Sequence, residues 1–231
     1  MLKAIDLTKK YNGTFALNGV SFEVNKGEIF CLLGQNGAGK TTTINLFLGF
    51  IEATAGQALI NNVEVKPNLS ETNKMIAYIP EIVQLYGNLS GIENLDFFSR
   101  LAGFKYDQNQ LAEFLIKSGL QKEVHSKSLS EYSKGMRQKV GIAIALSKNA
   151  EVIFMDEPTS GLDPKATAEF TTICKELAVQ GKAIFMATHD IFNAVNVGTR
   201  IGIMKAGSLV HELTTANINA NQLQQLYLET I

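Results

Sequence analysis

Eight consecutive residues have the types and spacing of a loop that binds nucleotide phosphates: Gly34, Gln35, Asn36, Gly37, Ala38, Gly39, Lys40 and Thr41. An apolar run, Ile29–Leu33, precedes them and a helix-compatible stretch follows, which is the strand, loop and helix order that such a loop requires. Glycines let backbone N–H groups turn toward one anion, and the helix adds its positive dipole end. Lys40 supplies a charge for the β- and γ-phosphates, and the Thr41 hydroxyl can ligate Mg²⁺. We therefore expect residues 34–42, Thr42 included, to bind a nucleotide triphosphate.

Two adjacent carboxylates follow a second apolar run. Val152–Met155 has the composition of a buried strand, and Asp156 and Glu157 come directly after it. In phosphate-loop folds an aspartate at the end of such a strand holds Mg²⁺ from the side opposite the loop. A glutamate one residue later can polarise a water toward the γ-phosphate. On its own this pattern is weak, but after a phosphate loop it predicts a metal ligand and a catalytic carboxylate.

His189 lies just beyond the apolar run Ala183–Ala187. The carboxyl end of a strand in an open parallel sheet is where ligands bind. An imidazole there can donate a hydrogen bond to the γ-phosphate or hold the attacking water. The competing interpretation is a surface histidine at a strand end, and we adopt it for His125 and His211.

A second helix start has the chemistry of an anion site. Ser133, Lys134 and Gly135 lie where a helix through Val140 and Leu146 would begin, and a helix N-terminus attracts phosphate. One triphosphate needs a single cradle, so a second anion site indicates a nucleotide held by another copy of the chain. An ordinary capped helix start is the alternative explanation.

The elements that must position these residues follow the order of an α/β fold. Early residues such as Val20, Phe22 and Val24 alternate with polar ones as in a strand, and Gln57–Ile60 and Val63–Val65 flank a turn. We expect these segments to form an antiparallel layer, followed by a strand at Met75–Ile79.

From residue 82 to residue 150 the pattern becomes helical. Capping signals at Ser90 and Asp107 precede two helices, and the helix after Ser133 is the third. Beyond it the strands at 152–155 and 183–187 are separated by a helix that starts at Asp163, and a hairpin and a short helix end the chain. We expect one domain over residues 1–231, with residues 1–81 and 151–231 as core and 82–150 as an inserted helical lobe.

Composition narrows the functional classes. The 231 residues carry a net charge of -1, which gives no electrostatic basis for nucleic-acid binding. No apolar run approaches the roughly 18 residues of a membrane-spanning helix, and the charged N-terminus is unlike a secretory signal. Cys31 and Cys174 lack metal-ligand spacing and sit among apolar neighbours. We expect a cytosolic protein whose membrane role, if it has one, comes through a partner.

Together these motifs resemble the ATP-binding cassette subunit of ABC transporters, and the resemblance covers essentially the whole chain. Residues 34–41 resemble the Walker A loop, and Val152–Glu157 resembles Walker B with its catalytic glutamate. Ser160–Asp163 matches the D-loop, and His189 matches the switch histidine. The resemblance implies an α/β fold with a phosphate-loop NTPase (RecA-like) core, an antiparallel β subdomain and an inserted helical subdomain. It also implies that Lys40, Glu157 and His189 are catalytic.

Three further positions follow from the resemblance. Tyr11 matches the aromatic residue that stacks on adenine, and Tyr132–Met136 occupies the signature position usually written Leu-Ser-Gly-Gly-Gln. The resemblance implies that Ser133 and Gly135 contact the γ-phosphate of the nucleotide bound to the opposite subunit. This form of the signature, with Lys134 at its centre, is similar to cassettes that serve exporters with a separate permease chain.

One departure from the family pattern concerns the metal. Glu81 stands where the Q-loop glutamine is expected. A carboxylate about 5 Å from a phosphate charge would be repelled by roughly 3 kcal/mol at an effective dielectric near 20. Either Mg²⁺ bridges the two or Glu81 swings out; we favour the bridge, which makes Glu81 a metal ligand with Thr41 and Asp156, and Gln84 is a fallback ligand.

The sequence therefore predicts an ATPase that forms a homodimer around two Mg-ATP and drives an integral membrane permease, in the direction of export, from the cytoplasmic face of the membrane. Gln84–Leu101 is the expected docking surface for the permease, with Phe97, Phe98 and Leu101 partly exposed or, alternatively, buried in the helical lobe. One rival is a soluble ABC-type ATPase of a cytosolic machine, and another is a module that binds nucleotide without hydrolysing it.

Overall fold

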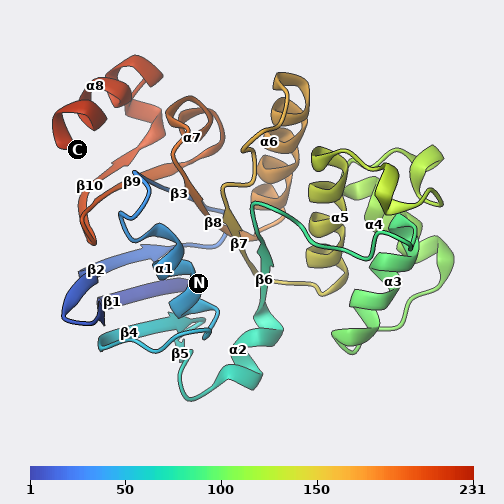
Figure 1. The fold of residues 1–231 in the computed structure, drawn as a ribbon, viewed down its shortest axis with the longest axis horizontal. Helices are drawn as coiled ribbons and strands as arrows, with labels where there is room; N and C mark the ends of the chain where they lie inside the picture. Colours follow the sequence, from blue (N-terminus) through green and yellow to red (C-terminus); the bar gives the residue numbers. More distant parts are fainter.

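The computed structural model describes residues 1–231, and a six-stranded sheet runs through its centre (Figure 1). The strand order is β10-β9-β3-β8-β7-β6, with every neighbouring pair parallel except β9 and β10. The strands are β3 (Ile29–Gly34), β6 (Ile76–Ile79), β7 (Val152–Asp156), β8 (Ala183–Thr188), β9 (Arg200–Lys205) and β10 (Ser208–Thr214). The parallel strands expected at residues 152–155 and 183–187 are confirmed as neighbours.

The central strands β3, β7 and β8 are apolar along most of their length because both faces of the sheet are covered, and the polar residues Asp156 and Thr188 stand at the ends of β7 and β8. Successive side chains point to opposite faces, so Phe30 and Leu32 of β3 enter one core while Cys31 and Leu33 enter the other. Both cysteines are free and buried, which agrees with their predicted role as small apolar side chains.

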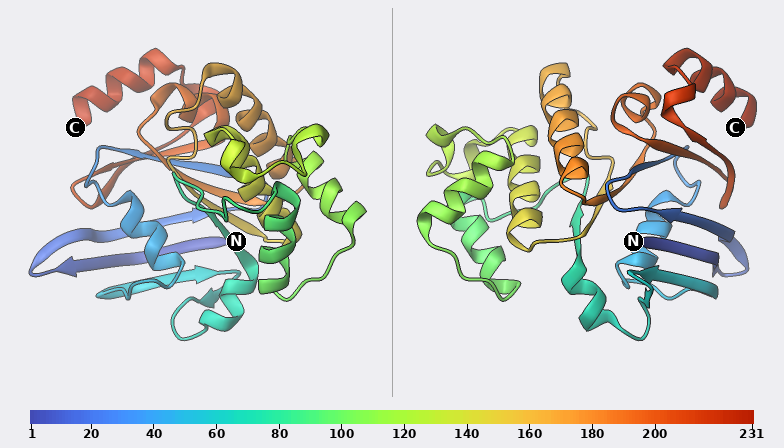
Figure 2. Two further views of the ribbon diagram at one scale, coloured as in Figure 1. Left: turned by 45° about the vertical axis from the view of Figure 1, so that its right-hand side comes forward. Right: turned by 180° about the vertical axis from the view of Figure 1, so that it is seen from behind.

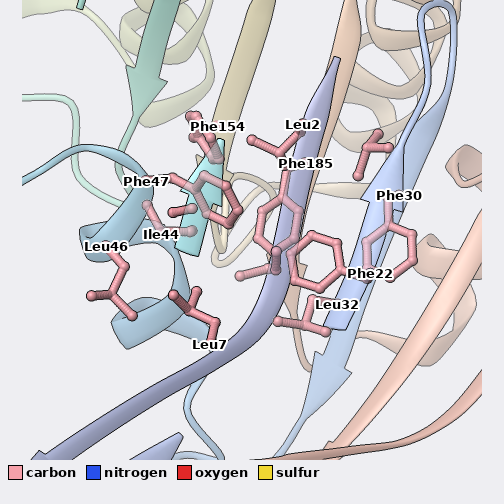
Figure 3. Close-up of a cluster of buried hydrophobic side chains, with 14 of the residues drawn as sticks. Leu2, Leu7, Phe22, Phe30, Leu32, Ile44, Leu46, Phe47, Phe154 and Phe185 are labelled. Carbon is pink, nitrogen blue, oxygen red and sulfur yellow. The ribbon is translucent and has the colours of Figure 1, made fainter. Parts of the chain in front are cut away.

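A second, antiparallel sheet covers one face of the first. Its order is β2-β1-β4-β5, from β1 (Leu2–Tyr11), β2 (Thr14–Val24), β4 (Ala55–Ile60) and β5 (Val63–Glu64). Helix α1 (Lys40–Phe47) packs into the core that both sheets share. Figure 3 shows the aromatic part of this core, where the Phe22 ring lies 5.3 Å from that of Phe30 and 5.4 Å from that of Phe185. The Phe22 ring also lies 6.0 Å from that of Phe47, the last residue of α1, so the helix packs on the same aromatic group.

Helices cover the other face of the six-stranded sheet. They are α6 (Pro164–Val179), α7 (Ile191–Val197) and α8 (Ala220–Thr230), which share a core with the odd-numbered residues of β3. None of the helices has the length and apolar character that crossing a bilayer would need.

Three helices lie together beside the sheet, at the right of Figure 1 and the left of the reverse view in Figure 2. These are α3 (Gly91–Leu101), α4 (Gln108–Lys117) and α5 (Lys134–Ser147), and they enclose a small core of their own that includes Leu95, Leu115 and Val140. Helix α5 also contributes Ile142 to the core of the sheet, so it joins this cluster to the strands. The division of the chain at residues 82 and 150 stays a prediction.

The mixed α/β fold class is confirmed, and most predicted element ends are close to the observed ones. One boundary is wrong: Met75, assigned to a strand, is the last residue of α2 (Leu69–Met75). The strand begins one residue later because Ile76 is the first residue with an extended backbone and pairs with Val152. The chain also contains three short 3₁₀ turns, at Lys122–Val124, Leu129–Glu131 and Thr215–Asn217.

Candidate functional site

A cleft of about 230 Å³ opens at the carboxyl ends of β3 and β7, and no apolar side chain lines it. Its lining residues are Gln35, Asn36, Gly37, Gly39, Lys40, Thr41, Thr42, Glu81, Asp156 and Glu157. The structure therefore brings the predicted phosphate loop, the two carboxylates after β7 and Glu81 to one place. Gly34 and Ala38 belong to the loop without lining the cleft.

The backbone of the loop has a conformation that only glycine adopts easily. Gly37 and Gly39 have φ angles of 83° and 111°, in the left-handed region. A Cβ atom on Gly39 would also lie 2.6 Å from the carbonyl oxygen of Ala16 on β2. Since Gly39 is the N-cap of α1, this close approach sets the loop at the positive end of the helix dipole.

Lys40 is buried at the base of the cleft. Its Nζ donates hydrogen bonds to the carbonyl oxygens of Gly34 (2.6 Å) and Gln35 (3.2 Å), and it lies 3.7 Å from Glu157 Oε1. Burial lowers the pKa of Lys40, and the charges of Glu157 and Asp156 oppose this shift. The ammonium group of Lys40 thus has three oxygen atoms around it and is placed to bind the oxygen atoms of an anionic ligand.

Thr41 and Asp156 place two side-chain oxygen atoms next to each other in the cleft. Thr41 Oγ1 donates a hydrogen bond of 2.9 Å to Asp156 Oδ2. Burial raises the pKa of Asp156, and the charges of Glu157 and Glu81 add to that effect while Thr41 and Lys40 oppose it. No cluster of three or more His, Cys, Asp or Glu side chains is close enough to enclose a metal. A site with one or two protein oxygens fits Mg²⁺, which takes its other ligands from phosphate and water.

Glu157 is held at the end of β8 by two consecutive residues. Its Oε2 accepts hydrogen bonds from the Thr188 hydroxyl (3.3 Å) and the His189 backbone N–H (3.4 Å), and its Oε1 lies 2.9 Å from His189 Nδ1. Glu157 has a φ of 46°, an uncommon conformation for a side chain of this size that often marks functional sites. Glu157 and His189 are therefore in direct contact, and Thr188 is a positioning residue that the sequence pattern did not indicate.

Glu81 faces two residues that the sequence did not connect with it. Its Oε1 accepts a hydrogen bond of 2.9 Å from Ser160 Oγ and lies 3.7 Å from Lys134 Nζ. The signal was present in the two departures from the family pattern, because a carboxylate and an ammonium group replace the expected uncharged residues. Gln84 does not line the cleft.

Ser133, Gly135 and Tyr11 lie outside the cleft. The Ser133 hydroxyl accepts a hydrogen bond of 3.2 Å from the Met136 N–H as the N-cap of α5, and Ser133 and Gly135 line a different cavity, between α5 and α6. Tyr11 is exposed at the end of β1, with Lys9 Nζ 4.9 Å from its ring centre. One copy of the chain does not bring these three residues to its own phosphate loop.

Comparison with known proteins agrees with this geometry. The family model described as ABC transporter matches residues 17–160. The chain is 36% identical over 214 residues to the bacitracin transport ATP-binding protein BcrA of Bacillus licheniformis, covering 92% of this chain and 69% of that protein. It is 33% identical over 221 residues to YbhF of Escherichia coli, a probable multidrug ABC transporter ATP-binding protein, of which it spans only 38% while 95% of this chain is covered.

Solved structures give the same result. The ATP-binding cassette MJ0796, in a dimeric post-hydrolysis state bound to ADP and Pi, superposes with a TM-score of 0.81. Its sequence identity to this chain is 27%, and the match covers 94% of this chain and 100% of that one.

Proposed function

The chain belongs to the ABC transporter family of ATP-binding cassettes, and from this membership we propose that it binds and hydrolyses ATP to drive a separate membrane permease. ATP hydrolysis is characteristic of these cassettes. The observation that carries the proposal is the polar cleft, in which Lys40, Thr41, Asp156 and Glu157 come from two strand ends to surround one volume.

The cleft residues support distinct roles in phosphoryl transfer. Lys40 and the N–H groups of residues 35–42 hold the triphosphate, and Thr41 and Asp156 hold Mg²⁺, which when bound neutralises charge on the phosphates. Glu157 orients the attacking water and accepts its proton. His189 contacts Glu157 through Nδ1, which fixes the carboxylate and leaves the imidazole at the rim of the cleft, where it steadies the γ-phosphate.

In this proposal a second copy of the chain completes the site. Ser133 and Gly135 begin helix α5 on another part of the surface from the cleft, and the N-terminus of a helix binds anions. In the proposed pair, each triphosphate lies between the loop of one copy and residues Ser133 and Gly135 of the other. The solved dimer of a 27% identical cassette supports this arrangement, and hydrolysis would remove the bridge and reopen the pair.

The permease, the direction of transport and the location of the protein belong to the same proposal. Relatives named for bacitracin and probable multidrug transport support export of a small molecule. The permease would hold the cassette at the cytoplasmic face of the membrane. Exposed Phe97 and Leu101 on α3, with half-buried Phe98 beside them, support this helix as the docking surface.

Two substitutions test binding and catalysis separately. Lys40→Ala should weaken Mg-ATP binding about 100-fold, because loss of a buried charged partner costs roughly 3 kcal/mol. Glu157→Gln should bind Mg-ATP with nearly unchanged affinity and lose phosphate release about 100-fold or more, the usual contribution of a general base. Calorimetry and a phosphate-release assay measure the two effects. Unchanged binding in the first variant, or unchanged turnover in the second, would contradict the assignment.

A further inference from the structure

Three side chains join helix α5 to the loop that follows β7. Glu81 accepts a hydrogen bond from Ser160 and lies 3.7 Å from Lys134 Nζ, as described above. Lys134 Nζ is also close to the neighbouring Gly161, where a Cβ atom would lie 3.8 Å from it. We call Glu81, Lys134 and Ser160 the charged latch.

The backbone beside the latch is fixed to the same helix. Gln138, one turn beyond Lys134 on the same face of α5, is buried and donates hydrogen bonds to the carbonyl oxygens of Pro80 (3.2 Å) and Glu81 (3.1 Å). The backbone at residue 81 therefore stays with α5. Only the Glu81 carboxylate, whose side chain is 50% exposed, is free to change partners.

Lys134 stands at a position that disfavours its charge. It is the first residue of α5, and the first turn of that helix contains no acidic residue. Cations are unfavourable at a helix N-terminus, where the dipole is positive and anions are attracted. Lys134 and the helix end thus require a negative partner, and Glu81 is the only one that forms an ion pair with Lys134.

Glu81 has a second possible partner on its other side. It lines the phosphate cleft together with Asp156 and Thr41, the two residues suited to Mg²⁺. The Glu81 carboxylate consequently lies between Lys134, which belongs to the signature, and the side of the cleft formed by Thr41 and Asp156, here called the metal side.

We propose that Lys134 exchanges Glu81 for the triphosphate bound to a second copy when two copies close, while Glu81 turns toward the metal side of its own cleft. The latch then sets the nucleotide concentration at which the copies pair. This inference rests on the two-copy mechanism proposed above, and it adds Lys134 to the residues that contact nucleotide across the pair.

The exchange gives the two charged residues effects of opposite sign. Glu81→Gln breaks the ion pair but leaves Lys134 available for the phosphate, so pairing becomes easier. Lys134→Gln breaks the same ion pair and removes the phosphate contact, so pairing becomes harder. If the pair only stabilised the fold, both substitutions would shift pairing in the same direction, because each breaks one and the same contact.

The experiment measures the Mg-ATP concentration for half-maximal dimerisation by sedimentation velocity, with Glu157→Gln in every chain to prevent turnover. Adding Glu81→Gln should lower this midpoint by about two- to fivefold, since partly exposed ion pairs contribute at most about 1 kcal/mol. Adding Lys134→Gln should raise it roughly tenfold, the effect of losing a hydrogen bond to a charged group. Glu23→Gln is the matched control, because it removes an ion pair of similar exposure, between Lys3 and Glu23 (3.5 Å) in the antiparallel sheet, whose residues line neither the cleft nor the cavity at Ser133 and Gly135. Its midpoint should stay within twofold.

Thermal denaturation without nucleotide confirms that each variant is folded. Shifts of the same sign in the Glu81 and Lys134 variants, or no shift in either, would overturn the exchange while leaving the proposed function intact. Failure of the Glu157→Gln parent to dimerise at all would overturn both.

Discussion

Asp156 is a carboxylate placed where its charge is costly. Burial raises its pKa above the ordinary value of 3.8, so between pH 3.8 and the raised value the folded chain binds more protons than the unfolded chain. Stability therefore falls as pH rises through this window, and the penalty persists at neutral pH. In the proposed function this carboxylate supplies a hard oxygen for Mg²⁺, so the stability cost of its charge would accompany a gain in function.

Asp156→Asn should consequently stabilise the protein in the absence of nucleotide at pH 7. The amide oxygen can still accept the hydrogen bond from Thr41. We expect a melting temperature higher by about 2–4 °C, which corresponds to roughly 1 kcal/mol in a chain of this size, and a difference that narrows toward pH 4. The same variant should lose most of the extra stability that Mg-ATP confers on the wild type.

Thermal denaturation at several pH values, with and without Mg-ATP, checks both effects. Asp96→Asn is the control, because Asp96 forms an exposed ion pair with Arg100 within α3, and such pairs contribute little. A variant that melts below the wild type at pH 7 without nucleotide would show that the buried charge is not the dominant contribution.

The sequence motifs predicted most of the residues that line the cleft, because the spacing of glycine, lysine and threonine in a phosphate loop is closely tied to the conformation of that loop. They could not show that Thr188 supports Glu157 or that Glu81 faces Lys134 and Ser160. These contacts join segments far apart in the chain, and they depend on how α5 packs against the sheet.

Among the elements, helices with strong caps were predictable. Ser90, Asp107 and Asp163 each accept a hydrogen bond from the backbone N–H three residues on, at the starts of α3, α4 and α6. The short helices α2 and α7 were not predicted, because seven residues show too little periodicity. Strand β1 was only partly recognisable, since Asp6 has a left-handed φ of 46° and the register with β2 shifts beside it.

Helix α3 presents an apolar face that its own fold does not use. Phe97 and Leu101 are 41% and 73% exposed, and the Tyr86 ring lies 5.0 Å from that of Phe97. Exposed apolar groups gathered on one element are typical of a binding surface. Because Leu101 is mostly exposed and Phe97 is only partly buried, they contribute less to folding than core residues do.

Phe97→Ser and Leu101→Ser should therefore each weaken binding to the permease about tenfold, as apolar anchors at interfaces do, with little change in ATP affinity or melting temperature. Pull-down from detergent-solubilised membranes, followed by mass spectrometry, measures the retained membrane protein. Val179→Ser, at the exposed end of α6, is the matched control. Retention of the same membrane protein by wild type and both α3 variants would contradict α3 as the docking surface.

The molecule as a whole separates the two halves of the proposed phosphate site. The cleft lies at the carboxyl ends of β3 and β7, whereas Ser133 and Gly135, at the start of α5, line a different cavity. Alternating and continuous apolar patterns predicted the two sheets and the helices around them. The separation of the two halves is a property of the whole arrangement, because it depends on where the three-helix cluster sits beside the sheet (Figure 2).

The pairing of two copies around shared nucleotide is the central claim, and sedimentation velocity of the Glu157→Gln variant with saturating Mg-ATP tests it most directly. The account predicts a species near twice the 25.2 kDa mass of one chain, which disappears when nucleotide or Mg²⁺ is withdrawn. A variant that binds Mg-ATP in calorimetry and still sediments only as a single chain would contradict it.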